Sequence, residues 1–194
     1  MRILKFITNL RKQKRFTYED FFQNKAPDIN GNYLKDYWAM SNDELEIKHD
    51  YIQYMFPLFE HSRVKPFTPI LTEYEINQMK RNQIECNNIL KNIKKSFEIM
   101  LDFYGLRFVN EEIQKCTFFE KRKANWINSG NHNYLRITRI LKCLMIFEMT
   151  DEAMAFYRIL LKLKEEYQEE IDDLSVEFWS EAIEKYLYKK DTGI

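Results

Sequence analysis

The chain has 194 residues, of which 45% are apolar and 31% are charged, and this length and composition fit one globular domain with its own core. Its 30 basic and 30 acidic residues cancel, which argues against a generally basic nucleic-acid-binding protein. Only four glycines and four prolines interrupt the sequence, so we predict an all-α fold, a single compact domain of several helices.

Residues 1–20 are predicted to form a basic amphipathic leader, and residues 21–190 a helical domain. Apolar residues of the leader recur at helical spacing with basic residues around them, and polar residues interrupt the run that a signal peptide would need. We therefore predict no signal peptide. Pro27 and Gly31 then indicate a turn, and a short helix is expected over about residues 33–38.

A capping signal and a proline bound the next expected helix. The side chain of Ser41 or Asn42 can accept a hydrogen bond from a free backbone N–H group at the start of a helix. This helix should run to about Met55, because Pro57 cannot continue it. Residues 57–71 contain three prolines and are predicted to form an ordered, irregular loop. This loop has three apolar side chains that we expect to be buried, namely Phe59, Phe67 and Ile70.

Two capping patterns predict the central helices. Thr72 and Glu75 have the spacing of a capping box, in which each side chain bonds to the other residue's backbone. A similar pattern from Asn82 begins a long helix over about residues 83–104, and Gly105 stands where a left-handed C-terminal cap belongs. The apolar stripe of this long helix is broad, so we place the helix at the centre of the fold.

The last third of the chain contains three more expected helices. Residues 106–130 select neither a helical nor a strand period, and they end in a turn. Asn131 or Asn133 can cap the first of the three helices, Thr150 the second and Ser175 the third. Each helix has apolar residues at helical spacing, so all three should pack on the core.

Two arginines are the main candidates for a binding site. Arg136 and Arg139 are three residues apart on the helix that follows Asn131, so their side chains can lie within reach of each other. Each guanidinium can hold a carboxylate or a phosphate through two hydrogen bonds, which predicts a clamp for an anionic ligand. The alternative is that both arginines form internal ion pairs, because half-buried arginines are usually paired. The acids considered as partners are Asp36, Asp50 and Glu98.

The three histidines are His49, His61 and His132, and none has a partner at the spacing of metal ligands, so no metal site is predicted. His49 precedes Asp50, with Gln53 one turn further on, and this group could position a proton donor. No nucleophile is identifiable beside it, so no catalytic residue is predicted. A structural, hydrogen-bonded histidine is the other interpretation, for His132 as for His49. We keep these residues as candidates for a polar ligand-binding site.

Aromatic side chains lie near the same segments. Tyr51 and Trp126 could anchor a peptide in a groove, although rings at helical spacing usually face the core. The basic run at residues 121–123 could contact phosphates beside Trp126. Zero net charge nevertheless makes nucleic acid or a membrane surface an unlikely partner. Glycine-rich nucleotide-binding loops are missing from the sequence, and no cofactor is predicted.

The cysteines bear on the compartment of the protein. Cys86, Cys116 and Cys143 are odd in number and lack C-x-x-C spacing, so neither a disulfide framework nor a zinc site is predicted. An intracellular, reducing compartment fits them best. We expect no membrane span, because no apolar run approaches the ~20 residues that cross a bilayer.

Four segments of the sequence resemble the conserved region of one known family, the opioid growth factor receptor family. They are Pro27 to Asp36, His49 to Leu58 (HDYIQYMFPL), Phe97 to Leu106 (FEIMLDFYGL) and Asn131 to Lys142 (NHNYLRITRILK). Tyr54 stands where the family usually has tryptophan. The resemblance extends from about Phe21 to Leu187, and all four segments occur in the order of the family.

The resemblance implies an all-helical, intracellular domain. Vertebrate members of the family are described as receptors for the pentapeptide Met-enkephalin that associate with the nucleus. The chain ends near residue 194, and its composition suits an AT-rich genome, so we expect a short, microbial-type member without the C-terminal repeats of the vertebrate members. The resemblance carries over no reaction and no site residue.

We predict a non-enzymatic module that binds a peptide, a protein partner or a small anionic ligand, with Arg136 and Arg139 holding its carboxylate in a groove between helices. One alternative is an enzyme that acts on an anionic substrate through His49, Asp50 or His132. Another is an adaptor that binds a membrane or nucleic acid through its basic segments.

Overall fold

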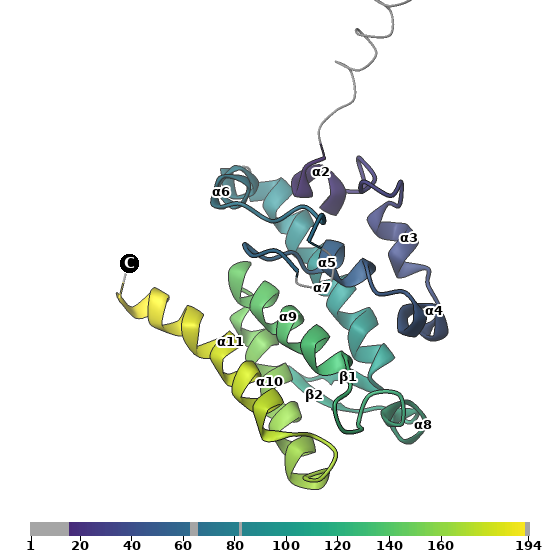
Figure 1. The fold of residues 1–194 in the computed structure, drawn as a ribbon. Coiled ribbons are helices and arrows are strands. Elements are labelled where there is room, and N and C mark those ends of the chain that lie inside the picture. The colour runs from purple at the N-terminus through teal and green to yellow at the C-terminus, as the bar shows by residue number, and fades with distance from the viewer. Residues whose placement is uncertain (1–15, 63–65, 82, 193–194) are drawn as a thin grey trace, which may run out of the picture.

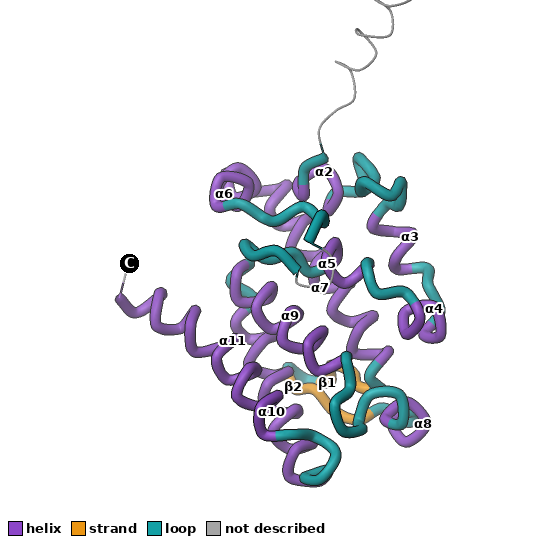
Figure 2. The backbone as a smooth tube through the Cα atoms, in the orientation of Figure 1, coloured by secondary structure: helices purple, strands orange, loops and turns teal. Residues whose placement is uncertain are grey.

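The computed structural model of the protein describes residues 16–62, 66–81 and 83–192. Most of these residues are helical, and a single two-stranded sheet completes the described part of the domain (Figures 1 and 2). The predicted all-α class is therefore confirmed, with a small sheet added. The amphipathic helix that we expected near the N-terminus falls in residues 1–15, outside the described residues.

Four short helices form the N-terminal part of the domain. They are α2 (Tyr18–Phe22), α3 (Leu34–Trp38), α4 (Asn42–Ile47) and α5 (Tyr51–Met55). The turn before α3 is held by Asp28, whose Oδ1 accepts hydrogen bonds from the backbone N–H groups of Asn30 and Asn32 at 2.8 and 2.9 Å. The hydroxyl of Tyr37 donates to the same carboxylate, and the Tyr37 ring stacks on Tyr54 at 6.2 Å between centroids. An aromatic core thus joins α3 to α5.

The structure corrects the predicted helix that should have run without interruption to Met55. The capping box of Ser41 and Glu44 starts α4 as expected, but the backbone becomes extended at Lys48 and a separate helix begins at Tyr51. The break allows every residue of α5 to be buried. Backbone carbonyls that lose their helical partners at the break must find others, and a distant side chain supplies them, as described below.

The predicted irregular loop lies between α5 and α6, and its ends are tied together because the N–H of Leu71 donates to the carbonyl of Leu58 at 2.9 Å. Both of these leucines are buried. The prediction was wrong for Phe67 and Phe59, of which 92% and 38% are exposed, and Ile70 is half-buried. The loop is therefore attached to the core at its two ends, while the Phe67 ring points into solvent.

The first of the two central helices agrees with its capping signal, and Asn82, the predicted cap of the second, lies outside the described residues. Helix α6 (Glu73–Arg81) begins after the capping box of Thr72 and Glu75, and α7 (Gln83–Phe103) is the long central helix. Figure 1 shows α7 running through the middle of the molecule, with α2 and α6 near its beginning and β1 after its end. Gly105 follows with φ of 76°, the left-handed cap that was predicted.

Residues 106–130, which showed no clear period, contain a hairpin and a short helix. Strands β1 (Leu106–Val109) and β2 (Glu112–Lys115) pair antiparallel, and α8 (Phe119–Lys123) follows. Asn110 and Glu111 form the two-residue turn with positive φ angles of 48° and 68°, as a type I′ hairpin requires. Four residues per strand are too few for alternation to be visible in the sequence.

The last three helices are α9 (Asn133–Ile146), α10 (Thr150–Glu166) and α11 (Asp173–Thr192). Helix α9 packs against both of the others, and it lies beside α11 in Figure 1. The indole N–H of Trp179 donates to the carbonyl of Tyr134 at 3.2 Å and fixes the beginning of α11 on that of α9. Within the described residues, the helices are too short or too polar to cross a membrane.

Candidate functional site

Arg136 lies on α9 with its guanidinium inside the protein, where 5% of the residue is exposed. Its Nη1 donates to the carbonyl of Leu45 at 3.1 Å and to Oδ1 of Asn133 at 3.0 Å. Its Nη2 donates to the carbonyl of Lys48 at 3.2 Å and lies 2.9 Å from Nδ1 of His49. The arginine therefore provides the partners that the break between α4 and α5 requires, and most of its donors are occupied.

Glu46 is the carboxylate that faces this cluster. Its Oε2 lies 3.9 Å from Nη1 of Arg136 and accepts a hydrogen bond from Nδ2 of Asn133 at 3.3 Å, while its Oε1 lies 3.4 Å from Nε2 of His132. The rings of His49 and His132 meet edge to face at 5.2 Å between centroids. Burial and the neighbouring charge of Arg136 lower the pKa of His132, so its neutral form is favoured. We call Glu46, His49, His132, Asn133 and Arg136 the Arg136 cluster.

The ion pairs considered in the sequence analysis are not the ones that Arg136 forms. Asp36 caps α3 by accepting from the backbone N–H of Tyr33 at 2.7 Å, and Asp50 lies 3.5 Å from the amide nitrogen of Asn30. Glu46 could not be predicted as a partner, because an acid on a short helix carries no signal of a distant contact in a single sequence. Arg136 is thus used internally, by two backbone carbonyls and by the side chains of Asn133 and His49.

The other candidate residues divide between the Arg136 cluster and the core. Tyr51 is buried beneath Arg136, whose guanidinium carbon lies 5.3 Å from the ring centroid. Gln53 is buried beside Ser62. Trp126 is a core residue whose indole N–H donates to the carbonyl of Tyr104 at 3.1 Å. The structure therefore brings His49, His132 and Tyr51 to Arg136, and it leaves Trp126 without an accessible surface.

Arg139, one turn further along α9, lies in a different environment. Its Nη1 donates to the carbonyl of Phe56 at 3.1 Å, and within the described part of the chain it makes no ion pair with a carboxylate. Burial lowers the pKa of its guanidinium. Glu60 is the nearby acid: it accepts a hydrogen bond from Nζ of Lys142 at 2.8 Å, and its pKa is lowered by Lys142 first and then by Lys185 and Arg139. Lys142 therefore contacts Glu60 directly, and Lys185 and Arg139 add electrostatic attraction.

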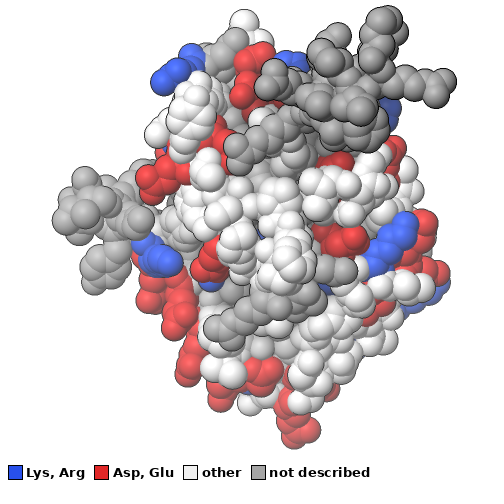
Figure 3. Space-filling model, turned by 45° about the horizontal axis from the view of Figure 1, so that its top comes forward, with Lys and Arg blue, Asp and Glu red and all other residues white. Residues whose placement is uncertain are grey.

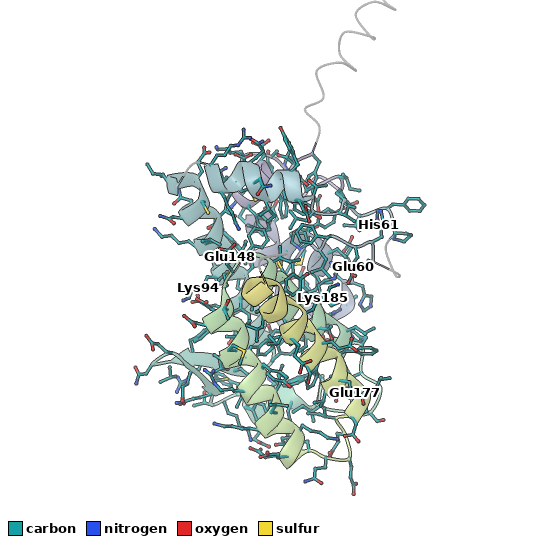
Figure 4. The ribbon with its side chains drawn as sticks, turned by 90° about the vertical axis from the view of Figure 1, so that its left-hand side faces the viewer. Glu60, His61, Lys94, Glu148, Glu177 and Lys185 are labelled. Carbon is teal, nitrogen blue, oxygen red and sulfur yellow. The ribbon has the colours of Figure 1, made fainter. Side chains whose placement is uncertain are left out.

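A pocket of about 420 Å³ opens beside Glu60, and we call it the Glu60 pocket. Its charged lining comes from Glu60, Glu73, Lys142 and Lys185, and Arg139 is not part of the lining. Its apolar lining consists of Leu58, Phe59, Ile70, Leu71 and Tyr186. Figure 4 shows Glu60 and Lys185 next to each other beside the C-terminal part of α11. The pocket combines an apolar floor with cations from two helices.

A larger groove, of about 660 Å³, lies between α6, α7 and the turn from α9 to α10. Two of its three lysines form ion pairs, since Lys80 pairs with Glu148, and Lys94 pairs with Glu152 at 2.9 Å. In Figure 4, Lys94 and Glu148 lie on the other side of the end of α11 from Glu60 and Lys185. Among the described residues, no group of His, Cys, Asp and Glu side chains is arranged to hold a metal ion.

Comparison with known proteins identifies the family. Residues 7–191 match the sequence model described as "Opioid growth factor receptor (OGFr) conserved region". The "Opioid growth factor receptor-like protein 1" of Mus musculus is 32% identical over 146 residues, which cover 70% of this chain and 29% of the mouse protein. The corresponding protein of Xenopus tropicalis is 32% identical over 71% of this chain and 27% of its own length.

The human "Opioid growth factor receptor" is 35% identical over 134 residues, covering 64% of this chain and 18% of the human protein. The chain therefore spans less than a third of the length of these curated relatives. No solved structure matches the chain. Because the family match extends over nearly the whole sequence, the chain belongs to the opioid growth factor receptor conserved region family.

Proposed function

We propose that the protein is a non-enzymatic binding module that holds the carboxylate or phosphate group of a ligand in the Glu60 pocket. The observation that carries this proposal is the gathering of Arg139, Lys142 and Lys185 around Glu60. Within the lining, Lys142 and Lys185 balance Glu60 and Glu73, and Arg139 on the same helix as Lys142 adds a third positive charge that acts on Glu60. A bound anion would share Lys142 with Glu60 and would be attracted by Lys185, which lines the same pocket.

This proposal assigns different roles to the two arginines that we first considered together. Arg136 donates hydrogen bonds to the carbonyls of Leu45 and Lys48, and it is buried away from solvent and ligands. Nη1 of Arg139 donates one hydrogen bond to the carbonyl of Phe56. The clamp is therefore proposed to consist of the two lysines, with Arg139 adding positive charge near Glu60, while Arg136 supports the helix on which Arg139 and Lys142 lie.

The enzyme alternative is less well supported by the geometry. His49 and His132 face Arg136 and Glu46, and neither lines the Glu60 pocket or the larger groove. Their positions fit a structural hydrogen-bonded cluster. A nucleic-acid partner is also less well supported, because lysines and arginines are scattered over the face shown in Figure 3 and do not form a single basic patch.

The ligand that we favour is a peptide within the cell. A peptide supplies a carboxylate through its C-terminus or an acidic side chain, and the name of the human relative describes a receptor. The three cysteines are free thiols, and Cys143 is buried, which suits a reducing compartment. Both the peptide class and the intracellular location belong to the proposal.

Titration with N-acetyl-aspartate amide, followed by amide NMR shifts, tests the proposal. We expect the shifts to map to residues around Glu60, Lys142 and Lys185, and to disappear in a variant with Lys142→Gln and Lys185→Gln. Lys80→Gln is the matched control, because Lys80 is a lysine of the larger groove. Equal shifts in the wild type and the double variant, or shifts that map elsewhere, would overturn the proposal.

A further inference from the structure

We propose that the ligand is a short, extended peptide that carries one acidic group and one large apolar side chain about 10 Å apart. The acidic group occupies the Glu60 pocket, so this inference rests on the proposed function. The apolar side chain docks on an apolar strip formed by Leu135, Leu174 and Phe178. The strip lies on the outer surface of α9 and α11, next to the line where the two helices meet.

The two helices run side by side in the same direction. Near their beginnings, the rings of Tyr134 and Trp179 meet at 5.8 Å between centroids. Further along, Lys142 and Lys185 line the same pocket. Figure 1 shows the same parallel course of α9 and α11. Positions that are equally far along the two helices are therefore neighbours.

The spacing of the exposed residues is the same on both helices. Leu135 and Lys142 are seven residues apart on α9, and Phe178 and Lys185 are seven residues apart on α11. Seven residues are close to two helical turns, so each pair shares a face and is separated by about 10 Å along the helix. Each helix thus presents an apolar side chain at one end of the surface and a lysine at the other.

The strip is accessible although its neighbours belong to the core. Leu135, Leu174 and Phe178 are 60%, 57% and 38% exposed, whereas the adjacent Tyr134 and Trp179 are buried. Leu174 and Phe178 are one turn apart on α11, and Leu135 and Phe178 each adjoin one of the two buried rings that meet. Single exposed apolar residues are ordinary, but helical spacing places these three on the face that carries Lys142 and Lys185 two turns further on, so one ligand can cover both.

Charge decides the orientation of the peptide. Glu177 and Glu181 are exposed on α11 beside the strip, and Figure 4 shows Glu177 well below Lys185 on that helix. An acidic group is repelled at the apolar end and attracted at the lysine end. The acidic group of the peptide therefore points toward the C-terminal end of α11, and the residues between its two anchors are neutral or basic.

The spacing also sets the length of the recognised segment. An extended chain advances about 3.3 Å per residue, so anchors about 10 Å apart are three residues apart in the peptide. Burial of a large apolar side chain is expected to strengthen binding by about tenfold or more over the acidic group alone. A peptide with the apolar residue first and the acid third after it meets both requirements.

Amide NMR titrations with four acetylated and amidated peptides test the inference. The full probe is Phe-Ser-Ala-Asp, and its matched controls are Ala-Ser-Ala-Asp, Phe-Ser-Ala-Asn and the respaced Phe-Asp-Ser-Ala. We expect the full probe to bind about tenfold more tightly than each control and to shift residues of both the strip and the Glu60 pocket. In the protein, Leu135→Gln with Phe178→Gln should remove this advantage, and Ile47→Gln, an exposed apolar residue on α4, should not.

The outcomes separate the inference from the proposed function. If Ala-Ser-Ala-Asp binds at the Glu60 pocket as tightly as the full probe, the pocket is an anion site and the apolar strip plays no part in it. If neither acidic peptide shifts residues of the pocket, the proposed function fails and the inference fails with it. Equal binding of the respaced peptide would overturn the predicted separation of the two anchors.

Discussion

Arg136 illustrates how one buried side chain can hold two segments of a chain together. It accounts for the carbonyls of Leu45 and Lys48, which lie at the break between α4 and α5. We expect Arg136→Ala to lower the free energy of unfolding by about 3 kcal/mol or more, because buried carbonyls would lose their donors. Urea denaturation at pH 7 measures this loss.

Two matched variants show whether the effect belongs to this position. Arg139→Ala removes one hydrogen bond to a backbone carbonyl, so it should cost about 1 kcal/mol. Arg136→Lys should recover little stability, because an ammonium group cannot replace a planar guanidinium that bonds in several directions. Equal losses for Arg136→Ala and Arg139→Ala would contradict the internal role that we assign to Arg136.

The buried tyrosines offer a second test at the scale of single residues. The hydroxyl of Tyr104 is buried without a hydrogen-bond partner in the described residues, whereas that of Tyr37 donates to Asp28. We expect Tyr104→Phe to leave the free energy of unfolding unchanged or to raise it by up to about 1 kcal/mol, and Tyr37→Phe to lower it by about 2 kcal/mol. Thermal and urea unfolding of both variants measure the difference. A clear loss for Tyr104→Phe would show that its hydroxyl has a partner in solution.

Helix boundaries could be predicted where their cause is local. Ser41 with Glu44 and Thr72 with Glu75 form the capping boxes that their spacing indicates, and both helices start there. The break after Ile47 could not be predicted, because its carbonyls are satisfied by an arginine about ninety residues away in the sequence. Local patterns therefore predicted the starts of these two helices, while tertiary hydrogen bonds decided where one of them ended. The predicted caps Thr150 and Ser175 were wrong, because no side chain among the described residues caps α10, and Asp172 accepts from the N–H of Ser175 at the start of α11.

Gly105 allows a prediction at the scale of packed elements. A Cβ atom on Gly105 would lie 2.7 Å from Cα of Phe119, so the turn after α7 and the start of α8 are in close backbone contact. Gly130 also has a positive φ, of 70°, but no atom lies within 4 Å of the position of its Cβ. Gly130→Ala should cost about 1 kcal/mol for the left-handed backbone alone. Gly105→Ala should cost at least about 2 kcal/mol more, since the backbones must separate.

Thermal unfolding of the two glycine variants measures this difference. Both substitutions add one methyl group at a left-handed position, so the strain of the backbone is matched and the contact with Phe119 is what distinguishes them. Equal melting temperatures would mean that α8 moves away without loss, and that the contact between α7 and α8 contributes little to the stability of the domain.

At the scale of the whole molecule, the sequence identified α9 as the important helix but could not tell which of its arginines faces the interior. Arg136 and Arg139 marked this helix, yet Arg136 is internal, and Arg139 lies one turn further along, near the pocket that contains Glu60 and Lys185. Glu60 comes from the loop before α6, and Lys185 comes from the last helix, α11. Their meeting depends on how three distant segments pack, which no periodicity or spacing within one segment can indicate.

The Arg136 cluster makes the stability of the whole domain depend on pH. His132 faces Arg136, His49 and Glu46, and its pKa is lowered from an ordinary value of 6.5, chiefly by burial. As the pH decreases through about 6.5, His132 takes up a proton in the unfolded chain before it does so in the folded protein. Protonation therefore favours the unfolded chain, and we expect the free energy of unfolding to fall below about pH 6.5. The decline should stop once the pH is low enough for folded His132 to be protonated as well.

Free energies of unfolding in urea at pH 7.5 and pH 5.5 measure this dependence. We expect the wild type to be less stable at pH 5.5, and His132→Gln to reduce the difference because it removes the proton-binding group and keeps a polar side chain toward Glu46. His61→Gln is the control, since His61 lies exposed in the loop before α6 and should leave the difference unchanged. If His132→Gln loses as much stability between the two pH values as the wild type does, the loss arises elsewhere, and the contact between α4 and α9 is not the pH-sensitive link in the fold.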